Sequence, residues 1–316
     1  MGETVDLVLE GGGVKGIALV GAIAVLEEHG YRFHRVAGSS AGAIVGALVA
    51  AGMPASRLQE VMGTLDFKGF EDGTALDRVP LIGRGLSLLL DRGIFVGDYL
   101  HELISHHLAE LGVETFHDLH EPDPESQLPA SMQYKLLVTA TDVSRGRLLR
   151  LPWDYPLHGI DPDTQLVADA VRASMSIPFF FRPVALPMPG AEPSVLVDGG
   201  MLSNFPVDAF DRSDGRPPRW RTIGIKLMTR TQPGAVLHEV RGNLSLASAV
   251  LGTMQNWHDE MRLEDPAVAQ RTIFVDTFGV KATDFEIDRA IRQRLYESGR
   301  AAAQSFLDSS EVVAPA

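Results

Sequence analysis

The sequence predicts an α/β fold built on parallel strands. Apolar, strand-like runs at residues 5–10 and 33–37 are each followed by a helix-like run, at residues 17–29 and 41–51. Glycines separate strand from helix at both junctions. This alternation is typical of a βαβ unit, whose strands lie parallel because the helix carries the chain back to the starting edge.

Each of these two helices has its own signature. Leu19, Ile23 and Leu26 recur at helical spacing, which indicates an apolar face on the first helix. The second helix carries Gly42 and Gly46 one turn apart. Without side chains at these positions, we expect it to lie close against the sheet.

The rest of the chain contains further elements of both kinds. Residues 54–130 look mostly helical or irregular, with the clearest amphipathic helix at residues 97–111. We also expect strands at residues 135–141, 195–197, 222–227 and 272–275, and helices at residues 169–176 and 285–307. We expect a single domain over residues 1–316, with a motif-bearing core at about residues 5–210 that residues 220–310 complete.

Composition narrows the class of protein. The 316 residues carry a net charge of −13, which argues against nucleic acid or a strongly anionic membrane as a partner. There is no cysteine, so disulfides and thiolate metal sites are excluded. The longest small or apolar run, residues 41–53, is too short and glycine-rich to span a bilayer. We expect a cytoplasmic protein, and the sequence leaves non-classical secretion open.

The pentapeptide Gly38-Ser39-Ser40-Ala41-Gly42 lies where the second strand meets its helix. Its G-x-S-x-G spacing is that of a nucleophile elbow, a tight turn that exposes the central serine hydroxyl. The alternative is a serine that caps the helix N-terminus. Ser39 is a rival for either role, but only Ser40 has a glycine two residues away on each side.

A second glycine cluster, Gly11-Gly12-Gly13-Val14-Lys15-Gly16, follows the first strand. Its G-x-G-x-x-G pattern suggests a dinucleotide site, but the acidic residue needed at the end of the second strand is absent. A P-loop is excluded because Gly16 is not followed by lysine. Two interpretations remain: an oxyanion hole made of backbone N–H groups, and a plain glycine turn.

An acidic residue, Asp198, ends the apolar strand at residues 195–197 and precedes Gly199 and Gly200. We expect it at the sheet edge where the carboxyl ends of parallel strands bind ligands. The alternative is an aspartate that caps its own turn.

An α/β-hydrolase triad would need a histidine after Asp198, and His238 and His258 are the residues of that type downstream. Neither has a strand-end glycine context, and Ser40 follows only two strands, which is early for that fold. Four further histidines lack the spacing of a metal site, and we expect them to be solvated: His106, His107, His117 and His120.

Together, the glycine cluster, the serine pentapeptide and Asp198-Gly199-Gly200 resemble the patatin-like phospholipase family. Residues 173–178 (Ala-Ser-Met-Ser-Ile-Pro) and 204–206 (Asn-Phe-Pro) are also similar to family motifs. The similarity covers roughly residues 5–210. Two departures are Ser39, where the family often has alanine or threonine, and the phenylalanine in residues 204–206.

The resemblance implies a three-layer α/β fold, with a mostly parallel central sheet flanked by helices on both faces. It implies a Ser40–Asp198 dyad without histidine that cleaves lipid ester bonds, and an oxyanion hole at Gly11, Gly12 and Gly13. The remaining motif residues would support this site: Lys15, Gly16, Gly38, Gly42, Gly199 and Gly200.

For ligands, we expect a lipid ester as substrate, transient contact with a membrane or micelle surface, and no cofactor, metal or nucleic acid. Residues 177–181 and 86–90 are candidates for an acyl pocket or a membrane-touching rim, with plain core as the alternative. A Ser–Asp dyad determines that an acyl group is hydrolysed, but it does not determine which alcohol or thiol leaves. A thioesterase or general carboxylesterase is therefore an alternative. A non-catalytic lipid-binding module is the alternative from another class.

Overall fold

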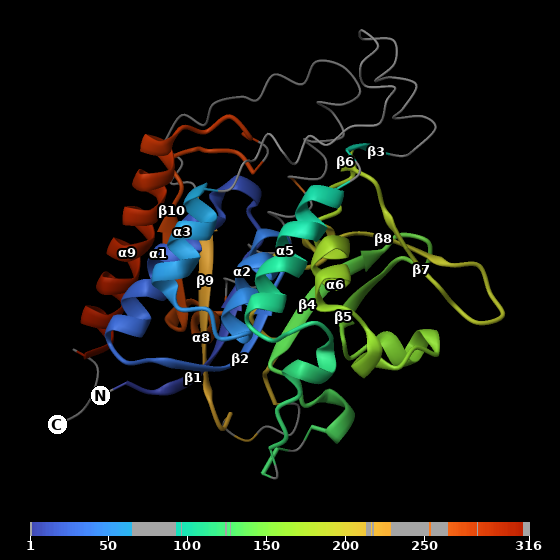
Figure 1. Ribbon diagram of the computed structural model, residues 1–316. Coiled ribbons are helices and arrows are strands. Elements are labelled where there is room, and N and C mark those ends of the chain that lie inside the picture. The colour runs from blue at the N-terminus through green and yellow to red at the C-terminus, as the bar shows by residue number, and fades with distance from the viewer. Residues whose placement is uncertain are drawn as a thin grey trace, which may run out of the picture.

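A mixed sheet of eight strands forms the centre of the protein in a computed structural model (Figure 1). The structure describes residues 2–64, 93–95, 97–123, 125–126, 128–212, 216, 218–228, 253, 265–282 and 284–311. The strands of this sheet are β1 (Thr4–Leu9), β2 (Arg32–Gly38), β4 (Leu136–Asp142), β5 (Arg147–Leu151), β7 (Val184–Leu186), β8 (Ser194–Asp198), β9 (Arg221–Met228) and β10 (Thr272–Asp276). A separate pair consists of β3 (Gly93–Phe95) and β6 (Phe179–Phe181).

Helices connect most of these strands. The α-helices are α1 (Gly16–Glu28), α2 (Ala41–Ala50), α3 (Ala55–Thr64), α5 (Asp98–Glu110), α6 (Val167–Ser174), α8 (Pro266–Gln270) and α9 (Arg289–Glu311). Short 3-10 helices are η1 (Gly13–Lys15), η4 (Phe116–Leu119), η5 (Ala130–Met132), η6 (Tyr155–His158), η7 (Pro162–Thr164) and η8 (Gly199–Met201).

The sheet is mostly parallel, which confirms the predicted fold class. Its strands lie in the order β10-β9-β1-β2-β4-β8-β7, and β5 also pairs with β4. The five-strand half from β10 to β4 is parallel, whereas β5, β7 and β8 make antiparallel pairs. The prediction missed β5 and the three-residue strands β3, β6 and β7. A strand of three residues is too short to show alternation in a sequence.

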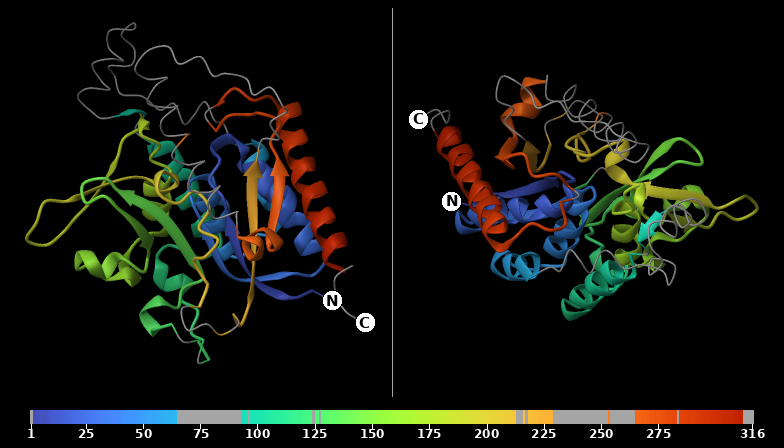
Figure 2. Two further views of the ribbon diagram at one scale, coloured as in Figure 1. Left: turned by 180° about the vertical axis from the view of Figure 1, so that it is seen from behind. Right: turned by 90° about the horizontal axis from the view of Figure 1, so that it is seen from above.

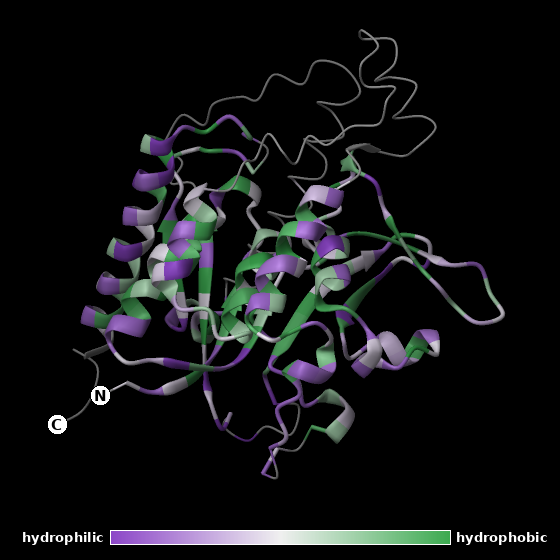
Figure 3. Cartoon of the chain, in the orientation of Figure 1, coloured by the Kyte–Doolittle hydropathy of each residue, from purple (hydrophilic) through white to green (hydrophobic). Residues whose placement is uncertain are grey.

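The core lies between the sheet and the helices in front of it. Helices α1, α2, α3, α5 and α6 cover the face toward the viewer in Figure 1. From behind, α8 and the chain that follows β8 lie over the strands (Figure 2). Hydrophobic residues concentrate on the strands and on α2, all ten residues of which are buried (Figure 3). Among the described helices, none is both long and apolar enough to cross a membrane.

The carboxyl ends of β2 and β8 meet along one edge of β4. Gly38 at the end of β2 pairs with Val138, and Asp198 at the end of β8 pairs with Ala140. Strand β5 pairs with both Val138 and Ala140, so it occupies the opposite edge of β4. Because β2 is parallel and β8 antiparallel to β4, β2 and β8 run toward one another and end two residues apart along β4.

Helix α9 packs against α1 through glycines on both helices. A Cβ at Gly21 of α1 would overlap the carbonyl oxygen of Tyr296, and a Cβ at Gly299 of α9 would overlap that of Ala18. Both obstacles are backbone atoms, which no side-chain rotation relieves. The two helix axes are therefore held closer than residues with side chains would allow.

We expect Gly299→Ala to lower the free energy of unfolding by about 2 kcal/mol, because the overlap outweighs the better helix propensity of alanine. Gly63→Ala in α3 is the matched control, since a Cβ there meets nothing within 4 Å. The control should raise the free energy of unfolding by up to about 1 kcal/mol. Urea denaturation measures both, and equal effects would contradict the close packing of α1 and α9.

Candidate active site

Ser40 lies on a strained turn between β2 and α2. Its backbone has φ 52° and ψ −123°, a left-handed conformation that non-glycine residues rarely adopt. The turn is tight because a Cβ at Gly38 would overlap the carbonyl of Gly42, and one at Gly42 would overlap that of Leu9. Ser40 occupies the N-cap position of α2, but its side chain makes no capping hydrogen bond. The helix-cap alternative is therefore wrong.

The neighbouring Ser39 differs from Ser40 in its exposure. Ser39 is completely buried, and its Oγ has no hydrogen-bond partner among the described residues. Ser40 keeps 4% of its surface exposed. The positive φ also belongs to Ser40 and not to Ser39. The structure thus places Ser40 at the apex of the turn, as the glycine spacing predicts.

Asp198 faces this turn from the end of β8. One carboxylate oxygen, Oδ1, accepts a hydrogen bond from the Gly200 N–H at 2.7 Å, so the turn-cap alternative is correct for that atom. The other oxygen, Oδ2, is buried without a hydrogen-bond partner of ordinary geometry among the described residues. Gly199 lets the turn close, since a Cβ there would overlap Thr139 of β4.

The route by which Asp198 reaches Ser40 differs from the prediction. An aspartate at the end of a parallel strand would share a sheet edge with the other carboxyl ends. Strand β8 is instead antiparallel to β4, and Asp198 arrives because β8 ends opposite the end of β2.

Burial raises the pKa of Asp198 to about 6, and hydrogen bonding by the Ser40 hydroxyl and the Gly200 N–H opposes that rise. The Ser40 hydroxyl is therefore close enough to influence Asp198, although it donates to Met175 Sδ at 3.5 Å in this structure. Catalytic hydrogen bonds are often long before substrate binds, so we regard the contact with Asp198 as weak here and not absent.

Three consecutive residues at the C-terminal end of α6 hold the ends of β2 and β8 together. The Ser174 Oγ accepts a hydrogen bond from the Ser40 N–H at 2.9 Å, and the Ser176 carbonyl accepts one from the Asp198 N–H at 2.9 Å. Met175 lies between them, against the Ser40 hydroxyl. Residues 173–178 are similar to a family motif, but nothing in the spacing of these residues predicts the contacts with Ser40 and Asp198.

The glycine loop lies against the serine turn. A Cβ at Gly11 would approach the Cβ of Ser40 to 3.0 Å and overlap the amide of Asn204. The Gly11 N–H donates to the Asn204 carbonyl at 3.0 Å, so it is not available to a substrate. The N–H groups of Gly12 and Gly13 have no backbone acceptor among the described residues. Of the three N–H groups predicted to form an oxyanion hole, these two remain candidates.

Contacts with residues far away in the sequence hold the glycine loop, residues 11–16, in its conformation. Gly13 has φ 55°, and a Cβ there would overlap the Ala282 carbonyl, which accepts a hydrogen bond from the Val14 N–H at 3.0 Å. The Asn204 side chain donates to the Gly11 carbonyl at 3.2 Å and to the buried Glu10 at 3.3 Å. These contacts keep the Gly12 and Gly13 amides in place before any ligand arrives.

A buried ion pair lies beneath the loop. Glu10 accepts a hydrogen bond from Lys226 Nζ at 2.6 Å and another from the backbone N–H of Leu227. Lys15 is half-buried nearby, and burial lowers its pKa, with Lys226 adding to that effect and Glu10 opposing it. Neither Glu10 nor Lys226 stood out in the sequence.

Helices α1 and α2 both begin beside the serine turn, because Gly16 at the start of α1 lies close to Ala41 at the start of α2.

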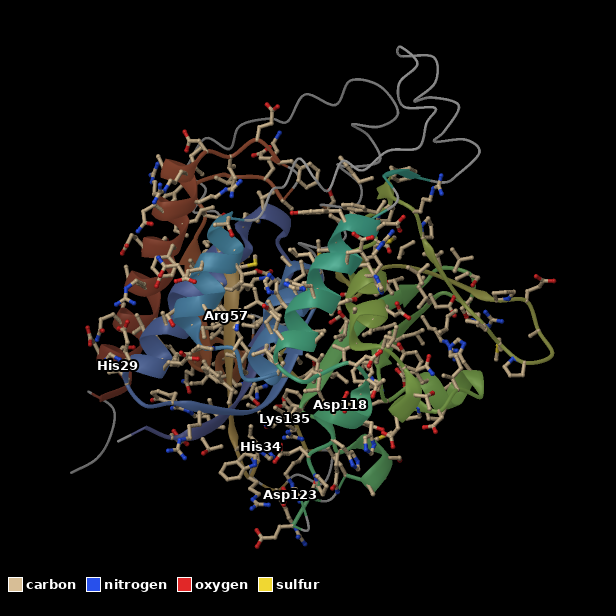
Figure 4. The ribbon with its side chains drawn as sticks, in the orientation of Figure 1. His29, His34, Arg57, Asp118, Asp123 and Lys135 are labelled. Atoms are coloured by element: carbon tan, nitrogen blue, oxygen red, sulfur yellow. The ribbon has the colours of Figure 1, made fainter. Side chains whose placement is uncertain are left out.

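Two other features of the surface contain none of these residues. On α5, the ligand atoms of His106, His107 and Glu110 lie within 4.8 Å of one another, but Glu110 already accepts a hydrogen bond from Arg57 at 2.6 Å. Figure 4 labels Arg57, which belongs to α3. A cavity of about 390 Å³ lies beside His34, near the opposite end of β2 from Ser40. His238, His258 and residues 86–90 fall outside the described residues.

A serine on a strained strand-to-helix turn, within a mostly parallel sheet and beside a buried carboxylate, has the geometry of a nucleophile elbow, the turn that serine hydrolases use. Comparison with known proteins specifies the family. The profile described as "Patatin-like phospholipase" matches residues 7–211. The chain belongs to the patatin-like phospholipase family, and it is a lipid acyl hydrolase by that membership.

Relatives occur in bacteria and fungi. "Uncharacterized protein YqhO" of Bacillus subtilis (strain 168) is 35% identical over 304 residues, which cover 96% of this chain and 98% of the relative. "Lysophospholipase nte1" of Aspergillus niger (strain ATCC MYA-4892 / CBS 513.88 / FGSC A1513) is 28% identical over 214 residues. That match covers 66% of this chain but only 11% of the much longer fungal protein.

Solved structures show the same fold. VipD from Legionella pneumophila superposes with a TM-score of 0.55 and 20% identity, covering 98% of this chain and 67% of VipD. A chain of the heterodimeric ExoU–SpcU complex from Pseudomonas aeruginosa gives a TM-score of 0.54 and 21% identity, with 98% of this chain and 52% of that chain covered. At these identities the likeness concerns the fold alone.

Proposed function

We propose that the protein hydrolyses carboxylic ester bonds of phospholipids or related lipids through a dyad of Ser40 and Asp198. One observation carries this proposal: β2 and β8 end facing one another on β4, which places a buried carboxylate oxygen without an ordinary hydrogen-bond partner beside a strained serine. A buried group left unsatisfied costs stability, so its retention favours a functional role.

In the first half-reaction, the Ser40 oxygen attacks the acyl carbonyl carbon while Asp198 Oδ2 takes the hydroxyl proton. The carbonyl π electrons move to its oxygen, which the N–H groups of Gly12 and Gly13 stabilise together with the N-termini of the two nearby helices. Collapse of this intermediate breaks the ester bond. The proton passes from Asp198 to the departing alcohol, and the acyl group stays on Ser40.

In the second half-reaction, water attacks the acyl-enzyme as Asp198 accepts its proton. The same two N–H groups stabilise the second oxyanion. Ser40 leaves with a proton returned by Asp198, which releases the fatty acid and restores the starting state. A single carboxyl therefore serves as base and acid in turn.

The raised pKa of Asp198 suits this double role. At about 6, the carboxyl is ionised near neutral pH yet is a stronger base than an ordinary aspartate. Within the described part of the chain, no histidine hydrogen-bonds with Ser40 or Asp198. His238 and His258 lie outside that part, so the proposal of a dyad is based on the geometry of Ser40 and Asp198 themselves.

A lipid panel tests this proposal. Wild-type protein and Ser40→Ala are each incubated with lysophospholipids, diacyl phospholipids and a fatty acyl thioester, and the released products are resolved by mass. Lysophospholipids come first because the fungal relative is named a lysophospholipase. Fatty acid released from a phospholipid by wild type alone supports the proposal. Turnover of the thioester alone would identify a thioesterase, and binding without any product would identify a lipid-binding module.

A further inference from the structure

Two exposed phenylalanines adopt backbone conformations that disfavour large side chains. Phe179 has φ 70° and Phe278 has φ 53°, and 41% of each residue is exposed. With Ser40, they are the non-glycine residues at positive φ among those described. Asparagine or glycine would suit both positions better, so bulky apolar residues there carry a cost both in backbone strain and in exposure to water.

Both phenylalanines belong to segments that also build the active site. Phe179 follows Ser176, whose carbonyl holds the Asp198 N–H, by three residues. Phe278 precedes Ala282, whose carbonyl holds the N–H of Val14 in the glycine loop, by four residues. Phe179 is therefore close in sequence to a residue that positions Asp198, and Phe278 to a residue that positions the glycine loop.

The two segments also touch each other. The rings of Phe180 and Phe285 meet edge to face, with their centroids 6.3 Å apart. Strand β6 and the segment between β10 and α9 lie at the same end of the molecule in both Figure 1 and the left view of Figure 2. The segments that carry Phe179 and Phe278 therefore adjoin at this end of the protein.

A cation accompanies one of these rings. The Arg294 guanidinium lies over the ring of Phe278, 3.8 Å from its centroid. Arg294 is exposed, and within the described part of the chain its contact is with the ring of Phe278. An aromatic ring and a guanidinium together match the boundary between acyl chains and phosphate groups at a lipid surface.

We propose that Phe179, Phe278 and Arg294 form a docking rim that seats the active site on a phospholipid surface. The rings enter the acyl boundary, and the guanidinium pairs with a lipid phosphate. Ser40 is only 4% exposed, so a membrane lipid must leave its bilayer to reach it, and contact at this rim shortens that path. The net charge of −13 favours zwitterionic over anionic lipid as the surface. This inference rests on the proposed function.

Vesicle binding tests the rim directly. Each protein carries Ser40→Ala, so that no lipid is consumed, and is mixed with phosphatidylcholine vesicles and sedimented. We expect Phe179→Asn combined with Phe278→Asn to weaken binding by at least about tenfold, because two apolar anchors are lost. Asparagine tolerates positive φ, so the fold should keep its thermal stability. Arg294→Gln should weaken binding several-fold.

Val143 and Leu157 provide the matched control. They are 45% and 55% exposed but lie in other segments of the chain, and replacing both by asparagine should leave vesicle binding unchanged. Equal losses in the two double variants would overturn the rim, and so would unchanged binding of the Phe179/Phe278 variant. Failure of the Ser40→Ala parent to bind phosphatidylcholine vesicles would overturn it as well, and preference for anionic vesicles would overturn the choice of surface.

Hydrolysis assays separate this inference from the proposed function. With Ser40 intact, the ratio of vesicle hydrolysis to hydrolysis of a short, soluble p-nitrophenyl ester should fall at least about tenfold in the Phe179/Phe278 variant. A fall in both rates by the same factor would count against the rim. A wild-type protein that binds vesicles through these residues but cleaves no ester would retain the rim and refute the hydrolase.

Discussion

Ser40→Ala is expected to reduce hydrolysis of every ester substrate by at least about a thousandfold, because the variant retains the oxyanion donors but has no nucleophile. Its free energy of unfolding should change by less than about 1 kcal/mol, since the lost hydroxyl makes only weak contacts, with Met175 Sδ and with Asp198. Initial rates on a soluble p-nitrophenyl ester, together with urea denaturation, measure the two quantities.

Ser39→Ala is the natural control for that substitution. Ser39 is adjacent and buried, and its side-chain Oγ has no hydrogen-bond partner among the described residues, so its replacement should leave the rate within about threefold of wild type. If Ser39→Ala abolished hydrolysis while Ser40→Ala retained it, the nucleophile would be Ser39 and the account of the turn would be wrong.

Asp198→Asn should separate activity from stability. We expect the variant to lose about a thousandfold in turnover, because asparagine cannot accept the Ser40 proton. It should nevertheless be more stable than wild type at pH 8. The folded-state pKa is raised from 3.8 to about 6, so the buried carboxylate destabilises the folded state above that pH. Two pKa units correspond to a stability gain of up to about 3 kcal/mol.

The sign of the pH dependence follows from the same shift. Below pH 3.8, Asp198 is protonated in both folded and unfolded chains, and its protonated form costs the folded state nothing. Between pH 3.8 and about 6, that stability is lost progressively as pH rises. The advantage of Asp198→Asn should therefore vanish below pH 4 and reach its full size above pH 6. A variant less stable than wild type at pH 8 would contradict the burial argument.

Wild-type activity should follow the ionised fraction of Asp198. We expect kcat/KM for the soluble ester to rise tenfold per pH unit below about pH 6 and to level off above it. Acid should thus inhibit the enzyme while stabilising this part of the fold. A rate independent of pH between 4.5 and 7.5, values that bracket the shift, would exclude a carboxyl base of this pKa.

The sequence was sufficient to predict those parts of the structure that are formed by a short, contiguous motif. The spacing of Gly38 and Gly42 predicts the turn at Ser40, because both glycines are required by overlap with nearby carbonyl groups. The apolar runs likewise predict β1, β2, α1 and α2, since their side chains are buried in one core. These features can be recognised from residues close together in the sequence, even where the contact that requires them, such as that of Gly42 with Leu9, is distant.

The pairing of strands and the contacts between residues far apart in the chain could not be predicted from the sequence. Nothing in the run that ends at Asp198 reveals that β8 is antiparallel to β4, because a strand's partner and direction are not encoded in its alternation. The commitment of the Gly11 N–H to Asn204 was equally hidden, since the two lie 193 positions apart. The roles of Ser174, Met175 and Ser176 depend on the same distant contacts.

Trapping the acyl-enzyme tests the central claim most directly. Wild-type protein is labelled with a fluorophosphonate, which captures an activated serine, and the modified peptide is identified by mass spectrometry. Our account predicts one adduct, on Ser40, that is absent in Ser40→Ala and forms at least about a hundredfold more slowly in Asp198→Asn. An adduct on another residue, or labelling of Ser40 at the same rate in Asp198→Asn, would contradict a dyad of Ser40 and Asp198.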